Sequence, residues 1–117
     1  IAITDSIMAA GLPDGKYKLG VNDVVVEDGD AKLATTGVRA GSTLTLAQAL
    51  KNIVKFTDHP VEAVIPLMTV NPARAMRMDD RKGSIEVGKD ADMYPITVEN
   101  KNIAATIGLG RLIYQAD

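Results

Sequence analysis

Asp5 is the first residue of this sequence whose type and position could support catalysis. It follows Ile1-Ala2-Ile3-Thr4, a short, partly β-branched apolar run of the kind found in buried parallel strands. Catalytic groups of α/β enzymes collect where such strands end, and a carboxylate there could move protons as a general acid or base. Taken alone, the pentapeptide favours a turn or cap residue that closes the strand. The rest of the chain has to decide between these two interpretations.

A second group of interest is Arg39-Ala40-Gly41, which is followed by Ser42 in a glycine-containing loop. The guanidinium and the backbone N–H groups of such a loop could bind an anionic ligand. A single arginine in a glycine-containing loop is also common on protein surfaces. From these residues alone, the surface interpretation is favoured.

The sequence contains one histidine, His59, and no cysteine. A catalytic transition-metal site normally needs several histidine and carboxylate ligands in one place. His59 stands before Pro60 at a predicted helix start, with no second histidine at a ligand spacing, so we interpret it as a cap or surface residue. This segment is therefore expected to hold no metal ligand set.

Composition excludes several classes of partner. The 13 basic and 15 acidic residues give a formal net charge of −2 without a block of like charge, so no nucleic-acid partner is expected. No apolar stretch approaches the ~20 residues that span a bilayer, so no membrane partner is expected either. The absence of cysteine is compatible with a reducing cytoplasm, and we predict a cytoplasmic location.

The chain is short for a complete enzyme of the barrel type. It has 117 residues and begins with Ile1 inside an apolar run, whereas a complete (β/α)8 barrel usually needs about 250 residues. We therefore expect an internal piece of a larger protein.

The first half of the chain predicts a hairpin ribbon followed by helices. Alternating and β-branched residues indicate short strands over 17–19, 21–27 and 31–34. Thr45 and Gln48 fit a capping box for a helix that runs to about Phe56. A second helix is expected from Pro60, with Asp58 or His59 as its cap and a kink or early end at Pro66. The last predicted helix, capped by Asn71, runs to about Met78.

The remaining residues predict a meander of strands. Short strands are expected over 85–87, 91–98, 103–107 and 112–114, separated by polar or glycine-rich turns. Pro95 cannot donate a hydrogen bond to a sheet, so its strand is expected at an edge or a bulge.

Two segments resemble a known enzyme superfamily. Asn71-Pro72-Ala73-Arg74-Ala75, followed by Lys82-Gly83-Ser84-Ile85-Glu86-Val87-Gly88-Lys89-Asp90-Ala91-Asp92, is similar to the C-terminal signature of the amidohydrolases. Thr4-Asp5, the loop from Ala9 to Gly15 and Ala40-Gly41-Ser42-Thr43-Leu44-Thr45 resemble, more narrowly, the N-acetylglucosamine-6-phosphate deacetylase family.

This resemblance implies an α/β fold: the C-terminal fragment of a (β/α)8 amidohydrolase barrel, with the C-terminal strands of its small β-sandwich domain. Residues 1–78 would be the end of the barrel with a β-hairpin insertion, and residues 79–117 the sandwich strands. Tyr94-Pro95 departs from the family by interrupting a strand that is usually apolar.

The resemblance also implies roles for particular residues. Asp5 would be the catalytic carboxylate, serving first as general base and then as general acid in amide hydrolysis. Arg39, Ala40 and Gly41 would contact a phosphorylated amino sugar. Arg39 stands where the family can have an apolar residue, which makes backbone contact the safer expectation.

A divalent metal, zinc or iron, and a homodimeric parent enzyme are further implications of the family. The metal and phosphate ligands of the family belong to earlier barrel strands and loops, which are not among these 117 residues. We therefore expect the segment alone to be inactive.

Two alternatives remain at this stage. The tail signature is shared with related amidohydrolases that open cyclic amides or deaminate bases. A separately folding segment without catalysis would be a structural module.

Overall fold

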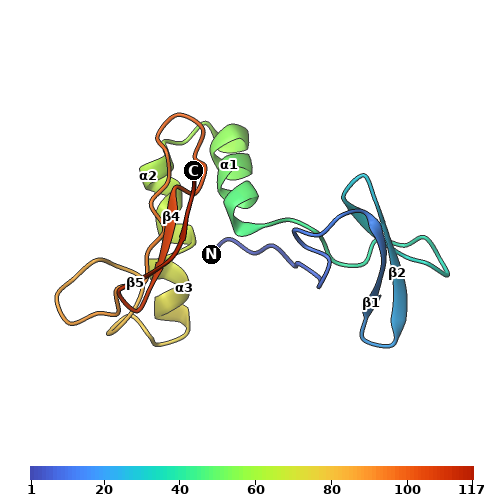
Figure 1. Ribbon diagram of the computed structural model, residues 1–117, viewed down its shortest axis with the longest axis horizontal. Coiled ribbons are helices and arrows are strands. Elements are labelled where there is room, and N and C mark those ends of the chain that lie inside the picture. Colours follow the sequence, from blue (N-terminus) through green and yellow to red (C-terminus); the bar gives the residue numbers. More distant parts are fainter. The chain divides into compact units, whose positions relative to one another are not determined.

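The computed structural model describes residues 1–117 and contains strands and helices in two compact units (Figure 1). One unit is Ile3–Ala49, and the other comprises Ile1–Ala2 with Leu50–Asp117. The elements in chain order are β1 (Gly15–Leu19), β2 (Asn22–Glu27), β3 (Asp30–Leu33), α1 (Leu46–Thr57), α2 (Val61–Val64), the 3-10 helix η1 (Ile65–Leu67), α3 (Val70–Ala75), β4 (Ala105–Gly108) and β5 (Arg111–Gln115).

The unit Ile3–Ala49 is built on an antiparallel meander in the order β1-β2-β3. Tyr17 pairs with Val24, and Val26 pairs with Ala31. Period-2 alternation points Val24 and Val26 to the same face of β2, and both are buried. The core of the unit consists of Ile7, Ala9, Val24, Val26, Ala31 and Ala40. The predicted hairpin ribbon is confirmed.

The expected strand over 1–4 is wrong. Residues 1–5 form no strand, and only Ser6 makes a single parallel bridge, to Ser42. An apolar run becomes a strand only where neighbouring strands pair with its backbone. Here no ladder partner lies beside Ile1 and Ile3, and both side chains are exposed.

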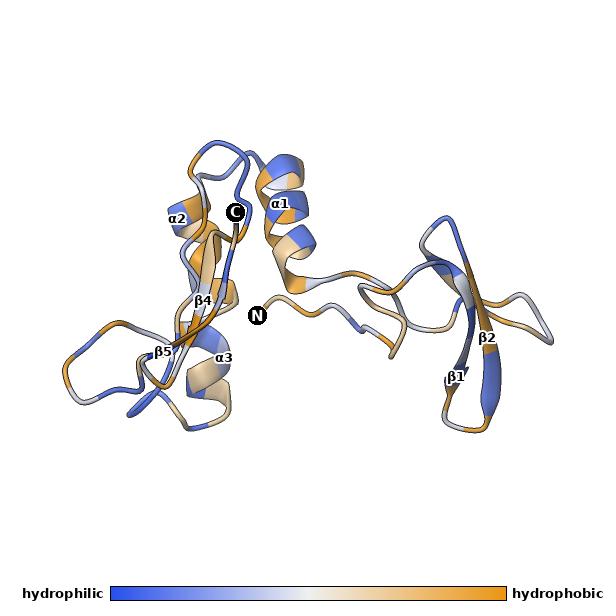
Figure 2. Cartoon of the chain, in the orientation of Figure 1, coloured by the Kyte–Doolittle hydropathy of each residue, from blue (hydrophilic) through white to orange (hydrophobic).

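Helix α1 begins as the sequence predicts. The Thr45 hydroxyl oxygen accepts a hydrogen bond from the Gln48 N–H at 3.2 Å, which satisfies one unpaired donor of the first turn. Ala49 and Leu50 are buried, and hydrophilic and hydrophobic residues alternate along α1 as expected for an amphipathic helix (Figure 2). Lys51 Nζ donates to Asn102 Oδ1 at 2.6 Å.

The following helices are short and differ from the prediction at their starts. Pro60 itself is the N-cap residue of α2, with no side-chain cap, so the caps predicted at Asp58 and His59 are wrong. Thr69, not Asn71, is the N-cap residue of α3. Pro72 is tolerated because the first-turn N–H groups have no partner within a helix anyway.

The early helix end expected at Pro66 is confirmed. Helix α2 stops at Val64, and Pro66 lies in the first turn of η1, where its missing N–H costs no hydrogen bond of the helix.

The tail forms fewer strands than predicted. β4 and β5 form an antiparallel pair with an irregular register at Thr106/Ile107. Residues 85–87 are not a strand, and 91–98 contributes only the bridges Met93–Ile107 and Ile96–Ile103. Alternation in the sequence was not sufficient: residues 85–87 make no bridge, and residues 93–97 lie beside residues 102–107 without forming a continuous ladder. Pro95 lies between the two bridges and accepts a hydrogen bond from the Ala104 N–H, in line with a bulged or edge position.

Ion pairs hold the turn that precedes this tail. Lys82 Nζ lies 2.9 Å from Asp90 Oδ2 and also pairs with Asp92. The hydrogen bond from Asp90, and then that from Asp92, raises the pKa of Lys82. Asp92 in addition accepts the Leu109 N–H at 2.7 Å, which ties the turn to the β4–β5 hairpin. The charged residues of the signature are thus engaged in structural contacts.

No helix has both the length and the apolar character needed to cross a bilayer.

The division of the chain at residue 78 into a barrel end and sandwich strands stays a prediction.

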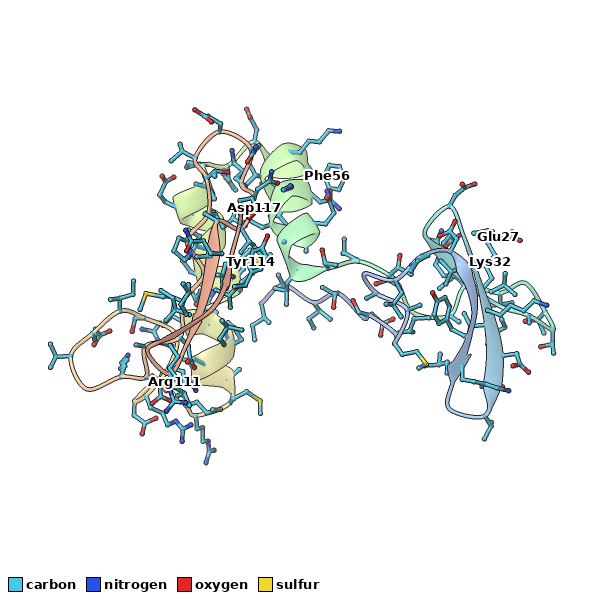
Figure 3. All side chains as sticks on the ribbon, viewed as in Figure 1. Glu27, Lys32, Phe56, Arg111, Tyr114 and Asp117 are labelled. Atoms are coloured by element: carbon cyan, nitrogen blue, oxygen red, sulfur yellow. The ribbon has the colours of Figure 1, made fainter.

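Strand β5 has an open edge and an exposed apolar surface. It pairs only with β4, and Leu112 and Ile113 are 60% and 69% exposed. Arg111 and Tyr114 mark this strand in Figure 3. Open apolar edges of this kind pair readily with other chains.

We predict that the 117-residue chain self-associates as its concentration rises, measured by light scattering. Leu112→Lys is expected to weaken association, because a charge at the edge opposes strand pairing. Val21→Lys adds the same charge at another exposed apolar residue, in the turn between β1 and β2, and serves as the control. A monomer at high concentration in the unsubstituted chain would contradict this expectation.

Candidate active site

The candidate site is built where residues 4–7 lie beside residues 41–44. The Ser42 N–H donates to the Asp5 carbonyl oxygen at 2.8 Å, and the Ile7 N–H donates to the Ser42 carbonyl oxygen at 2.9 Å. Together these bonds make the parallel bridge between Ser6 and Ser42. The two segments are 36 residues apart in the sequence and are fixed to each other through Ser42.

Two hydroxyl groups reinforce this backbone pairing. Ser42 Oγ donates to the Thr4 carbonyl oxygen at 2.5 Å and accepts the Leu44 N–H at 3.2 Å. In the reverse direction, Ser6 Oγ donates to the Leu44 carbonyl oxygen. Each segment therefore donates a side-chain hydrogen bond to the backbone of the other.

Asp5 has a left-handed backbone, with φ = 52°. This conformation is uncommon for residues other than glycine, although aspartate tolerates it better than most, and it persists where surrounding contacts impose it. The side chain is exposed, and no hydrogen bond or ion pair of the chain uses its carboxylate. The residue thus presents an unengaged carboxylate from a backbone that Ser42 holds.

Gly41 lies directly against this segment. Its φ is +65°, and a Cβ added there would lie 2.7 Å from Ile7 Cγ2 and 2.9 Å from the Asp5 carbonyl oxygen. Real Cβ atoms do not come this close. The same position is 3.8 Å from Asp5 Oδ2. The structure therefore brings Asp5 and Gly41, two of the predicted site residues, into one place.

Arg39 and Ala40 are engaged within the fold. Arg39 Nε donates to Asp30 Oδ1 at 2.8 Å, and Lys32, labelled in Figure 3, pairs with the same carboxylate at 3.4 Å. The hydrogen bond from Arg39 is the main reason why the pKa of Asp30 lies below its usual value. Ala40 is a core residue whose N–H donates to the Ala31 carbonyl oxygen at 2.9 Å. The Arg39 side chain and the Ala40 N–H therefore both have hydrogen-bond partners within the chain.

A cavity of about 510 Å³ opens beside this loop. Residues from the loops around Leu12, Asp30 and Gly41 line it, and Arg39 contributes to its wall. The Asp14 carboxylate accepts the Gly29 N–H at 3.1 Å and also the Asp28 N–H, which fixes the β2–β3 turn at the cavity.

Sequence reasoning did not identify Thr4, Ser6 and Ser42 as the residues that hold Asp5. The available signal was small hydroxyl residues next to both Asp5 and Gly41, since serine and threonine often hydrogen-bond nearby backbone. That signal does not reveal that the hydrogen-bond partners of Ser6 and Ser42 lie 38 residues away along the chain.

The residues of this chain do not fit a metal centre. No group of three or more histidine, cysteine, aspartate or glutamate side chains is placed so that it could hold an ion. His59, the single histidine, is exposed.

Comparison with known proteins identifies the protein family of this chain. The family model described as the amidohydrolase family matches residues 8–113. The chain belongs to the amidohydrolase family. Asp5 lies just before the matched range.

Within this family, the individual relatives are deacetylases of phosphorylated amino sugars. The chain is 37% identical over 114 residues to N-acetylglucosamine-6-phosphate deacetylase of Vibrio furnissii, covering 97% of this chain and 28% of the relative. It is also 37% identical over 96 residues to N-acetylgalactosamine-6-phosphate deacetylase of Escherichia coli O157:H7, covering 82% of this chain and 25% of the relative. The chain thus spans little more than a quarter of the length of these relatives.

The fold agrees with that of a solved deacetylase. The crystal structure of N-acetylglucosamine-6-phosphate deacetylase from Thermotoga maritima matches with a TM-score of 0.86 and 38% identity, over 97% of this chain and 31% of that one. The mixed α/β fold class and the resemblance to N-acetylglucosamine-6-phosphate deacetylases are confirmed.

The close approach at Gly41 predicts a specific loss of stability. Gly41→Ala is expected to lower the free energy of unfolding by roughly 1–3 kcal/mol more than Gly37→Ala, because the added methyl group overpacks the site. Gly37 is the matched control, since its φ of +69° is similar but nothing lies within 4 Å of its added Cβ. Denaturant unfolding followed by circular dichroism measures both. Equal losses would contradict the contact at Gly41.

The pairing of Arg39 with Asp30 predicts a pH dependence. A lowered carboxyl pKa stabilises the fold above the unfolded-state pKa, and this contribution disappears as the pH falls through the folded-state pKa. In Arg39→Met, we expect the pKa of Asp30 to rise towards its usual value, measured by NMR titration of the side-chain carboxyl.

Arg111→Met, which removes an exposed arginine of β5, is the control and should leave the pKa of Asp30 unchanged. The stability difference between Arg39→Met and the unsubstituted chain should vanish at acid pH. An unaltered Asp30 titration in Arg39→Met would rule out the pair.

Proposed function

We propose that the full-length protein hydrolyses N-acetylglucosamine 6-phosphate to glucosamine 6-phosphate and acetate. The observation that carries this proposal is the similarity to N-acetylglucosamine-6-phosphate deacetylases over 97% of the chain, in sequence and in fold. The contact between Asp5 and Gly41 supports it, because it brings a carboxylate and a substrate loop together.

In this proposal, Asp5 moves one proton through both halves of the reaction. Its carboxylate accepts a proton from water while the water oxygen forms a bond to the acetyl carbonyl carbon. The protonated carboxyl then donates that proton to the amine nitrogen as the C–N bond breaks. The free amine and the carboxylic acid leave, the acid ionises to acetate by releasing the second water proton to solvent, and Asp5 returns to its ionised form.

Arg39, Ala40 and Gly41 are the proposed substrate loop. The Arg39 side chain is paired with Asp30 and the Ala40 N–H with Ala31, whereas no hydrogen bond of the structure uses the Gly41 N–H. Contact through the backbone of Gly41 is therefore the form of binding that this geometry supports best.

We further propose that residues 1–78 belong to the end of a (β/α)8 barrel and residues 79–117 to a β-sandwich domain. The divalent metal of the superfamily, zinc or iron, would be held by residues of the full-length protein outside this chain. A cytoplasmic homodimer is the proposed assembly. Size-exclusion chromatography with light scattering on the full-length protein tests the dimer.

The galacto epimer is a second candidate substrate. The 37% identity to N-acetylgalactosamine-6-phosphate deacetylase equals that to the N-acetylglucosamine-6-phosphate deacetylase of Vibrio furnissii. The two substrates share the acetamide and the phosphate, so kcat/KM for each, measured side by side, identifies the preferred sugar. Hydrolysis of a cyclic amide or deamination of a base, without acetate release, would instead favour another amidohydrolase activity.

The role of Asp5 is tested in the full-length protein supplied with Zn²⁺ or Fe²⁺. Asp5→Asn is expected to lower kcat for acetate release by about 100-fold or more, because the amide cannot carry the proton. Asp58→Asn is the matched control, since Asp58 is also exposed and has a φ of 56°. An Asp5→Asn enzyme as active as the control would remove Asp5 from the mechanism.

A further inference from the structure

We propose that Ser42 is a positioning residue for Asp5, an inference that rests on the proposed deacetylase function. Ser42 does not belong to the proposed substrate loop or to the proton transfer. Ser42 instead forms hydrogen bonds with backbone groups of Asp5 and of residues on both sides of it in the sequence, Thr4 and Ile7. No other residue outside this segment makes hydrogen bonds to three of the residues 4–7.

The left-handed backbone of Asp5 is what Ser42 has to hold. At φ = 52° the Asp5 peptide is in a sparsely populated conformation, which relaxes unless neighbouring contacts oppose this. The Ser42 N–H fixes the Asp5 carbonyl oxygen on one side of the residue. The Ser42 hydroxyl fixes the Thr4 carbonyl oxygen, and therefore the peptide that leads into Asp5, on the other side.

The hydroxyl is the part of Ser42 that a substitution can remove. The two backbone bonds of Ser42 would remain with any side chain. The hydroxyl also connects the Thr4 carbonyl oxygen to the Leu44 N–H, so it adds to these two backbone bonds and fixes the peptide that precedes Asp5. Gly41 adds a steric limit, because the Asp5 carbonyl oxygen lies 2.9 Å from the place where a Cβ would be. The direction of the Asp5 carboxylate thus depends on the Ser42 hydroxyl.

The test compares Ser42→Ala with Ser84→Ala in the full-length enzyme. Ser84 is a matched control because its hydroxyl also makes two hydrogen bonds, to Glu86 and Lys89, and none to residues 4–7. We expect Ser42→Ala to lower kcat by about tenfold or more, since small displacements of a catalytic group cost large factors in rate. KM should change by less than about twofold, because the substrate loop is intact. Ser84→Ala should retain kcat.

A double-mutant cycle with Asp5→Asn distinguishes positioning from general structural damage. If Ser42 acts through Asp5, Ser42→Ala causes no further loss of kcat in the Asp5→Asn enzyme. Losses that multiply, or a Ser42→Ala enzyme that matches Ser84→Ala, would overturn the proposal. Circular dichroism establishes that each variant is folded.

Ser42→Cys covers the case in which Ser42→Ala does not fold. Cysteine keeps the size of the side chain and weakens the hydrogen bonds, so the folded variant should show reduced kcat with unchanged KM. Full activity in Ser42→Cys would contradict the proposal. Failure of the unsubstituted enzyme to release acetate is a separate result, because it would contradict the deacetylase function itself.

Discussion

The pairing of residues 4–7 with residues 41–44 is the contact on which the candidate site depends. It joins two segments that have no regular secondary structure, through one parallel bridge and the hydroxyl groups of Ser6 and Ser42. Glycine at position 41 is a condition for this pairing, because any side chain there would meet Ile7 and the Asp5 backbone. The unusual conformation of Asp5 follows from these contacts.

The antiparallel sheet β1-β2-β3 stabilises this pairing through the hydrophobic core. Ile7 lies in one paired segment and Ala40 directly precedes the other, and both pack into the core with Val24 and Val26 of β2. The Thr43 hydroxyl donates to the Gly29 carbonyl oxygen at 2.5 Å, while Asp14 binds the same turn. The hairpin predicted as an insertion therefore has a structural role at the site. Its core face and its turn both contact the loop that carries Gly41.

Local patterns in the sequence correctly predicted the parts of the fold that depend on interactions between residues close together in the chain. Alternation in β2 and the Thr45 cap of α1 depend on neighbours within a few residues, and both were found. The strand over 1–4 and the strand over 85–87 needed partner strands, which sequence patterns do not supply, and neither forms. In the site, the resemblance predicted Asp5 and Gly41 as site residues, and the structure shows that they lie side by side. Its left-handed backbone and its dependence on Ser42 arise from contacts across more than 35 residues, which no local pattern encodes.

The signature that relates the chain to amidohydrolases and the group proposed to do the chemistry belong to different parts of the molecule. Lys82, Asp90 and Asp92 form ion pairs that hold a turn, and Asp92 also binds the β4–β5 hairpin through Leu109. Their charges are balanced within the turn, so these residues hold the turn and are poorly suited to act on a substrate. Asp5 shows the opposite pattern, since its backbone is held and its carboxylate has no partner. A fixed backbone combined with an unengaged side chain is the arrangement that a proton-transfer group needs.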